Sequence, residues 1–181
     1  MRRMPNLRWI LPTLLLAVLL VAPTRAHAFG GTAAELARPG NFVVSNRANL
    51  GFTQGLSYAG ATIDLGPELD YMVVPGLSLG AAALFHWQSA DGHAAAGVVP
   101  QVGYDVTLSS TWSLWPRLAV TLWAGQPPGD WLTMEISAPF LVHPAQHFFF
   151  GFGPALSLGV AGNNRTDTLY GTFLVGGYFD S

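Results

Sequence analysis

Bulky apolar residues alternate with small or polar residues along most of the chain beyond residue 40. In residues 148–160, every second position from Phe148 to Val160 is a large apolar residue or proline. The positions between them, apart from Phe149, are glycine, alanine or serine. A period of two places such sets on opposite faces of a β-strand. The segment is therefore predicted to be a strand with one apolar face and one face of small residues.

The same period recurs along the rest of the sequence and predicts about eight strands of roughly 10 residues. The less apolar faces consist mostly of Gly, Ser, Ala and Thr, which is too small and too weakly charged for a solvent surface. This argues against a soluble sandwich or a lipocalin-like barrel, which buries its apolar face. The predicted strands are 42–53, 61–73, 77–87, 98–108, 112–123, 132–140, 148–160 and 169–179.

The predicted connections are alternately short and long. Tight turns are expected at 74–76, 109–110 and 143–146. Longer segments rich in Gly, Pro, Asn and Asp connect the other strand pairs, at 53–60, 88–96, 125–130 and 162–167. Short turns on one side and longer loops on the other are typical of transmembrane barrels.

Five prolines fall within the predicted strands. A closed barrel has no edge strand on which a proline is easily accommodated. We therefore expect β-bulges at some of them, and a bulge would exchange the inward and outward positions beyond it. The five are Pro67, Pro100, Pro116, Pro139 and Pro154.

Over residues 41–179 this pattern resembles the small eight-stranded outer-membrane β-barrel superfamily. The resemblance implies an all-β, eight-stranded antiparallel up-and-down transmembrane barrel in a bacterial outer membrane, with both termini in the periplasm. The last strand carries apolar residues at Leu169, Phe173, Val175 and Phe179, similar to the C-terminal strand that the outer-membrane assembly machinery recognises. It departs from that pattern by ending with Asp180 and Ser181.

The N-terminus has the features of a secretory signal. Arg2, Arg3 and Arg8 precede an apolar stretch at 10–21, and Ala26-His27-Ala28 forms a small-x-small cleavage site. The apolar stretch is shorter than the ~20 residues of a membrane-spanning helix. The expected organisation is a signal peptide at 1–28, a loose periplasmic leader at 29–40 and an outer-membrane barrel at 41–181.

Charge and cysteine content exclude several classes of function. Only 10% of residues are charged, and neither lysine nor cysteine occurs. Without residues 1–28, four arginines face ten acidic residues, a formal charge of −6. Nucleic-acid binding requires a basic surface, so it is not expected. Disulfides and thiolate metal sites are excluded.

If the apolar faces contact lipid, the ionisable side chains must lie inside the barrel. Buried charges must pair or be hydrated, because an isolated one is too unfavourable. We interpret them as a salt-bridged plug in the lumen. The alternative is a gated polar path, in which inward glycines leave room for water. The predicted network comprises Arg47, Asp64, Glu68, Asp70, Asp105, Arg117 and Glu135.

Aromatic residues near the strand ends predict two belts at the membrane interfaces. The alternation places Trp123 and Trp131 inward, however, so for these two residues capping of the lumen is an alternative. The candidate interfacial aromatics are Tyr71, Trp87, Trp112, Trp123, Trp131 and Phe179.

Enzymatic and metal-binding signals are weak. His86 and Ser89 lie three residues apart along a strand, which places them on opposite faces, and nothing else supplies a nucleophile with a base. His143 and His147 flank a turn without a neighbouring carboxylate or cysteine. No catalytic residue, cofactor or metal is therefore expected.

The expected function is a structural, scaffold or surface-interaction role in the outer membrane. A narrow channel for small or amphipathic solutes and a lipid-modifying enzyme are the alternatives. The expected partners are the lipid bilayer and the assembly machinery, and the protein is expected to be a monomer.

Overall fold

The computed structural model describes residues 32–54, 59–88, 94–125, 130–162 and 167–180. The predicted signal peptide lies outside these residues. None of the helices within them is long and apolar enough to cross a membrane.

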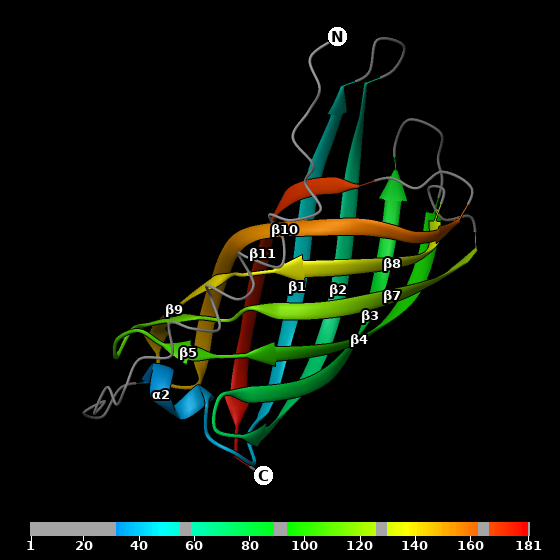
Figure 1. Cartoon of the computed structure of the whole chain (residues 1–181). Coiled ribbons are helices and arrows are strands. Elements are labelled where there is room, and N and C mark those ends of the chain that lie inside the picture. Colours follow the sequence, from blue (N-terminus) through cyan, green and yellow to red (C-terminus); the bar gives the residue numbers. More distant parts are fainter. Residues whose placement is uncertain (1–31, 55–58, 89–93, 126–129, 163–166, 181) are drawn as a thin grey trace, which may run out of the picture.

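Eight antiparallel strands form a closed barrel, as predicted (Figure 1). Neighbours along the chain are neighbours in the wall, and β11 pairs with both β10 and β1, which closes the ring. The wall strands are β1 (Phe42–Gln54), β2 (Ala59–Val74), β3 (Leu77–Gln88), β4 (Ala94–Tyr104), β7 (Arg117–Gly125), β8 (Asp130–Ser137), β10 (Phe148–Gly162) and β11 (Thr168–Phe179).

Three short strands extend the wall at one end. They are β5 (Val106–Thr107), β6 (Trp112–Leu114) and β9 (Phe140–Ala145). β5 pairs with β6, β6 with β9, and β9 with β10. β6 and β7 are separated at Trp115-Pro116, and β8 and β9 at Ala138-Pro139, so two of the predicted strands are interrupted at proline.

The prolines do not exchange the two faces, contrary to the concern raised by the sequence. Pro67 and Pro100 each leave a gap in the ladder to one neighbour, yet the register is the same before and after it. Across the break at Pro116, Ser113 and Arg117 are both buried. The physical reason is that a missing N–H removes a ladder bond without adding a residue, whereas a bulge requires an extra residue.

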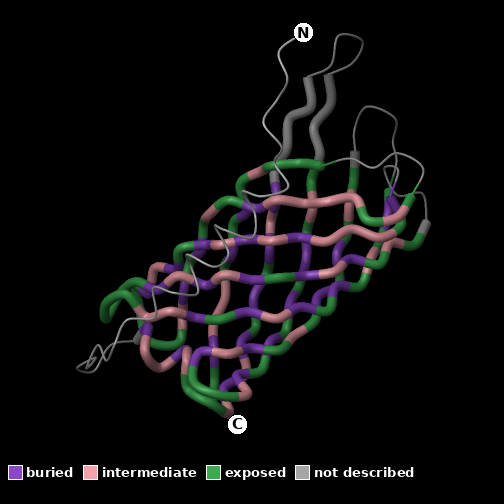
Figure 2. Tube along the Cα trace, viewed as in Figure 1, coloured by how far each residue is buried: buried purple, intermediate pink, exposed green. Residues whose placement is uncertain are grey.

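Burial alternates along the strands (Figure 2). Leu65, Val98 and Phe152 point outward, with 48%, 58% and 47% of their surface exposed. Most interior positions hold polar, charged or small residues, including Ser45, Gln101 and Ala119, and large apolar side chains are buried mainly at the end of the barrel where β11 ends. This is the reverse of a soluble barrel, in which the apolar face is buried.

The leader segment is not loose throughout, which corrects the expectation from the sequence. Helix α2 (Thr32–Leu36) lies at the end of the barrel where β11 ends (Figure 1), with Ala33 and Leu36 fully buried. Ala33 N donates to Ser110 O at 3.2 Å, and Gly76 N donates to Ala37 O at 2.9 Å. A helix of five residues is stabilised by such tertiary contacts rather than by its own propensity.

One predicted turn is displaced. The third tight turn was expected at 143–146, but β9 continues to Ala145 and the chain turns at Gln146-His147. His147 has a φ of 61°, a left-handed conformation that completes the reversal. The turn at 74–76 is present, with Gly76 at a φ of 80°. An added Cβ on Gly76 would lie 2.8 Å from Asp105 O, so this position requires glycine.

Candidate functional site in the barrel interior

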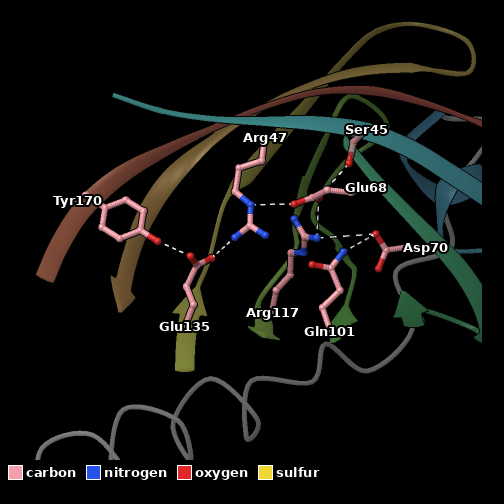
Figure 3. A network of polar contacts seen from close by, with 8 residues as sticks. All are labelled: Ser45, Arg47, Glu68, Asp70, Gln101, Arg117, Glu135 and Tyr170. Carbon is pink, nitrogen blue, oxygen red and sulfur yellow. Dashed lines mark hydrogen bonds and ion pairs between the residues drawn. The ribbon is translucent and has the colours of Figure 1, made fainter. Parts of the chain in front are cut away.

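A layer of ion pairs crosses the barrel interior (Figure 3). Register places Asp70, Gln101 and Glu135 in one row, because Asp70 is opposite Gly80, Gly80 opposite Gln101, Gln101 opposite Ala119, and Ala119 opposite Glu135. The row therefore brings polar side chains from β2, β4 and β8 into one cross-section.

Two arginines hold the layer together. Arg47 Nε lies 2.8 Å from Glu68 Oε1, and Arg47 Nη1 donates a hydrogen bond to Glu135. Arg117 Nη2 donates to Glu68 Oε2 at 2.7 Å and lies 3.7 Å from Asp70 Oδ2. Glu68 thus lies between both guanidinium groups. All five residues are at most 6% exposed, so these pairs are shielded from solvent and have a large energetic effect when broken.

Neutral donors complete the layer around the carboxylates. Ser45 Oγ donates to Glu68 at 3.1 Å, Gln101 Nε2 donates to Asp70 at 2.9 Å, and Tyr170 OH donates to Glu135. Each of the three carboxylates therefore forms an ion pair with at least one arginine and accepts a hydrogen bond from one uncharged side chain. The sequence did not assign Ser45, Gln101 and Tyr170 to the network, although their inward position in the alternation indicates it.

Gly80 makes the space that Asp70 occupies. A Cβ built on Gly80 would lie 2.2 Å from Asp70 Oδ1 and 2.6 Å from Leu69 O. Both are far closer than real Cβ contacts. The absence of a side chain on β3 at this height is therefore a condition for the ion-pair layer.

Two members of the predicted network lie elsewhere in the interior. Asp64 pairs with His86, whose Nδ1 lies 2.6 Å from Asp64 Oδ1. Asp105 is 4% exposed and follows β4 near the α2 end, without an ion pair in the described residues. The structure thus brings together five of the seven predicted residues: Arg47, Glu68, Asp70, Arg117 and Glu135.

Apolar side chains also occupy the interior, mainly on the α2 side of the ion-pair layer. Toward α2, Trp115 donates from Nε1 to Ser78 Oγ at 3.3 Å, and the Arg117 guanidinium lies 4.6 Å from the centre of the Trp115 ring. This end-layer consists of Leu36, Val43, Met72, Trp115, Leu141, Phe149, Leu174 and Tyr178. Toward the longer connections, Trp123 packs on a second cluster made of Ala82, Leu84, Val99 and Ala119.

Glycines receive large rings of the end-layer, whereas the gated-path alternative required inward glycines to leave room for water. A Cβ on Gly103 would lie 2.5 Å from Trp115 Nε1, and a Cβ on Gly176 would lie 2.6 Å from Phe149 Cζ. At these positions the space beside the glycine is occupied by a side chain rather than left for water.

Most candidate interfacial aromatics lie on the outer face. Phe42 joins two of them, with ring centres 5.0 Å from Tyr71 and 5.8 Å from Phe179. Trp123 was predicted to be an interfacial residue, and this prediction is wrong. The side chain turns inward, as the alternation indicated, and its Nε1 donates to Thr133 Oγ1 at 3.3 Å. Tyr71, Trp87, Trp112, Trp131 and Phe179 are 38% to 53% exposed.

Trp131 points outward, although the alternation predicted that it points inward. The period of two placed it inward, but it is 53% exposed, whereas its neighbour Asp130 is buried. The pairing of β8 with β10 shifts register here, between Gly159 and Gly162. An irregularity of this kind re-aims the side chains beyond it.

The three histidines that the structure describes, His86, His143 and His147, lie apart and each has its own polar partner. His143 lies inside the barrel with Nε2 3.3 Å from Ser113 Oγ, and both residues are buried. His147 lies in the turn, with Nδ1 3.1 Å from Tyr178 O. Within the described ranges, no group of three or more His, Cys, Asp or Glu residues could hold a metal. His86 pairs with Asp64, and Ser89 lies outside the described residues.

Comparisons with known proteins give no family. No family model and no curated protein matches the sequence. A solved structure described as "De novo design of transmembrane beta-barrels" matches with a TM-score of 0.48 and 12% identity, covering 80% of this chain and 98% of that chain. The conclusions below depend on the molecule's own surface and interior.

Proposed function

We propose that the protein spans a membrane as a barrel with a solid interior and has a structural or surface-interaction role. The outer face supports the membrane assignment, because it exposes apolar residues around the wall: Leu69 on β2, Phe85 on β3, Leu118 on β7 and Phe173 on β11 are each 41% to 54% exposed. Such a surface is unfavourable in water, whereas lipid accommodates it. The N-terminal signal and the C-terminal strand favour the bacterial outer membrane.

The filled interior is the observation that carries the proposed role. Over the described residues, α2 packs at one end, the end-layer and the ion-pair layer follow in the lumen, and the Trp123 cluster lies at and beyond the ion-pair layer. An eight-stranded barrel is just wide enough for side chains to fill it. An interior of this kind stabilises the barrel and gives a rigid support for the loops, and it argues against the channel alternative.

Conductance and membrane insertion test the proposal together. The mature protein should float with lipid vesicles, and its folded form should migrate differently from its unfolded form in an electrophoretic gel. Planar bilayers should show no discrete current steps. Current steps in wild type that change when Arg117 is replaced would overturn the solid interior and support the channel. Failure to float would overturn the membrane assignment.

β11 is the proposed contact with the assembly machinery. Its outward residues Leu169, Phe173, Val175 and Phe179 are 42% to 75% exposed. Replacement of Phe179 by serine should lower the amount of barrel recovered in the outer membrane, while Tyr104→Ser, at the same end on β4, should lower it less. Equal recovery of the two variants would contradict this assignment.

A further inference from the structure

A single asparagine interrupts the apolar outer face of the barrel. Asn46 on β1 is exposed, between the buried Ser45 and Arg47. Tyrosine and tryptophan aside, it is the one polar side chain at an outward strand position among those that the structure describes. The side-chain amide of Asn46 makes no hydrogen bond with any residue that the structure describes.

Register places Asn46 deep within the apolar band. Four residues toward α2, Phe42 belongs to the aromatic group with Tyr71 and Phe179. Four residues in the other direction, position 50 pairs with Ile63, which pairs with Trp87. At about 3.3 Å per residue, Asn46 lies about 13 Å along the strand from each of these rows. In lipid, an amide at this depth cannot hydrogen-bond to water.

We propose that Asn46 is the centre of a dimer interface between two copies of this chain within the membrane. The inference rests on the proposed membrane insertion, and it replaces the expectation of a monomer. An asparagine amide has both donors and an acceptor, so two symmetry-related asparagines can satisfy each other with two reciprocal hydrogen bonds. Polar side chains that hydrogen-bond across an interface are a known means of association in lipid, where apolar contacts alone give little driving force.

The surface on either side of Asn46 has the shape that a two-fold interface needs. A groove lies on the β10 and β11 side, lined by Phe150, Phe152, Phe173, Val175 and Asn46. On the other side, β2 presents Leu65 and Leu69, which are 48% and 50% exposed.

A two-fold axis along the membrane normal through Asn46 brings these two sides together. The axis places β2 of one copy opposite β11 of the other, so the leucines of each copy face the groove of its partner. Both copies keep the same orientation in the membrane, as insertion from one side requires. The interface is therefore self-complementary, with the amide pair at its centre.

The cysteine-free chain permits a direct test by cross-linking in vesicles. Asn46→Cys should give a covalent dimer with a short bifunctional thiol reagent, because the two copies of this residue face each other across the interface and sheets that pack face to face lie about 10 Å apart. Val98→Cys, which is 58% exposed on β4, is the matched control and should remain monomeric. Asn46→Leu should weaken dimerisation measured by energy transfer between labelled copies by about tenfold, which corresponds to about 1.4 kcal/mol.

The outcomes separate this inference from the membrane assignment. Equal cross-linking of the two cysteine variants, or unchanged energy transfer in Asn46→Leu, overturns the dimer. If a fluorophore attached to the cysteine at position 46 is quenched by lipid-bound probes but the protein is monomeric, lipid covers this face and the membrane assignment stands. Labelling of position 46 by a water-soluble reagent in folded barrels overturns both.

Discussion

The two faces of the barrel wall differ in how they accommodate polar side chains away from water. On β1, Arg47 points inward and contacts two carboxylates, whereas Asn46 points outward and contacts no polar partner in the described structure. The interior tolerates charge because strands far apart in sequence bring complementary groups to one height. The exterior has no such means, and it is almost entirely apolar. The difference teaches that position across the wall, rather than residue polarity, determines which substitutions the barrel accepts.

Among the substitutions considered, those that break the ion-pair layer should lower the free energy of unfolding most. Arg117→Met removes the cation nearest Asp70 and one of the two cations that contact Glu68. We expect the free energy of unfolding, measured by urea titration in lipid vesicles, to fall by about 3–5 kcal/mol, because an uncompensated buried carboxylate remains.

The partner substitution tests the cause of that loss. Adding Asp70→Asn to Arg117→Met should restore part of the stability, since the uncompensated charge is removed and Gln101 remains close. Arg38→Met, at an exposed arginine before β1, is the control and should change little. A neutral Arg117→Met would mean that water reaches this layer.

A polar probe should separate the two faces of β10. Phe152 is 47% exposed on the outer face, and Ser157 faces the interior opposite Glu135. Phe152→Asn loses apolar contact with lipid and places an amide in it, so we expect a loss of about 2–4 kcal/mol in the same titration. Ser157→Asn should stay within about 1 kcal/mol of wild type. Equal losses would show that this strand does not separate lipid from lumen.

Two glycines, one on each face of the wall, allow the faces to be compared by adding a single methyl group. Gly80→Ala would push a methyl group into Asp70 and Leu69 O, so we expect a loss of about 1–3 kcal/mol from overpacking. Gly171 is exposed on β11 and has nothing within 4 Å of an added Cβ. Gly171→Ala should therefore be neutral or slightly stabilising. A neutral Gly80→Ala in vesicle unfolding would mean that the interior layer is loosely packed.

The alternation was sufficient to predict the barrel and the face of most residues. The eight strands follow from a period of two, and the in-strand prolines did not disturb it because no residue was added. Trp131 was misplaced because a register irregularity leaves no mark on the apolar pattern.

Height along the barrel could not be read from the alternation. Asp64 and Asp105 face inward as predicted but lie apart from the network, because strand tilt and register decide which inward residues meet. Tyr170 joins Glu135 for the same reason. Helix α2 was missed because five residues carry too little periodicity and gain their stability from packing.

The smallest change in the global free energy of unfolding is expected for substitutions in α2, which packs on the end-layer but is not part of the wall. Leu36 on α2 is fully buried in the end-layer. A Leu→Ala change in a core usually costs about 2–5 kcal/mol, but we expect α2, a helix of five residues, to detach without unfolding the strands. We therefore expect Leu36→Ala to lower the global free energy of unfolding by less than about 1 kcal/mol. Hydrogen exchange of the Ala33 and Gly76 amides, which bond across this contact, should instead accelerate about tenfold or more.

The exposed Arg38 offers a control in the same segment, and Arg38→Ala should leave both measurements unchanged. A global loss of 2–5 kcal/mol in Leu36→Ala would contradict local detachment, and would place α2 in one cooperative unit with the barrel. Unchanged exchange of both amides would mean that the end-layer does not depend on Leu36. The first result would mean that the wall and its N-terminal segment together define the interior. The second would mean that the wall defines it alone.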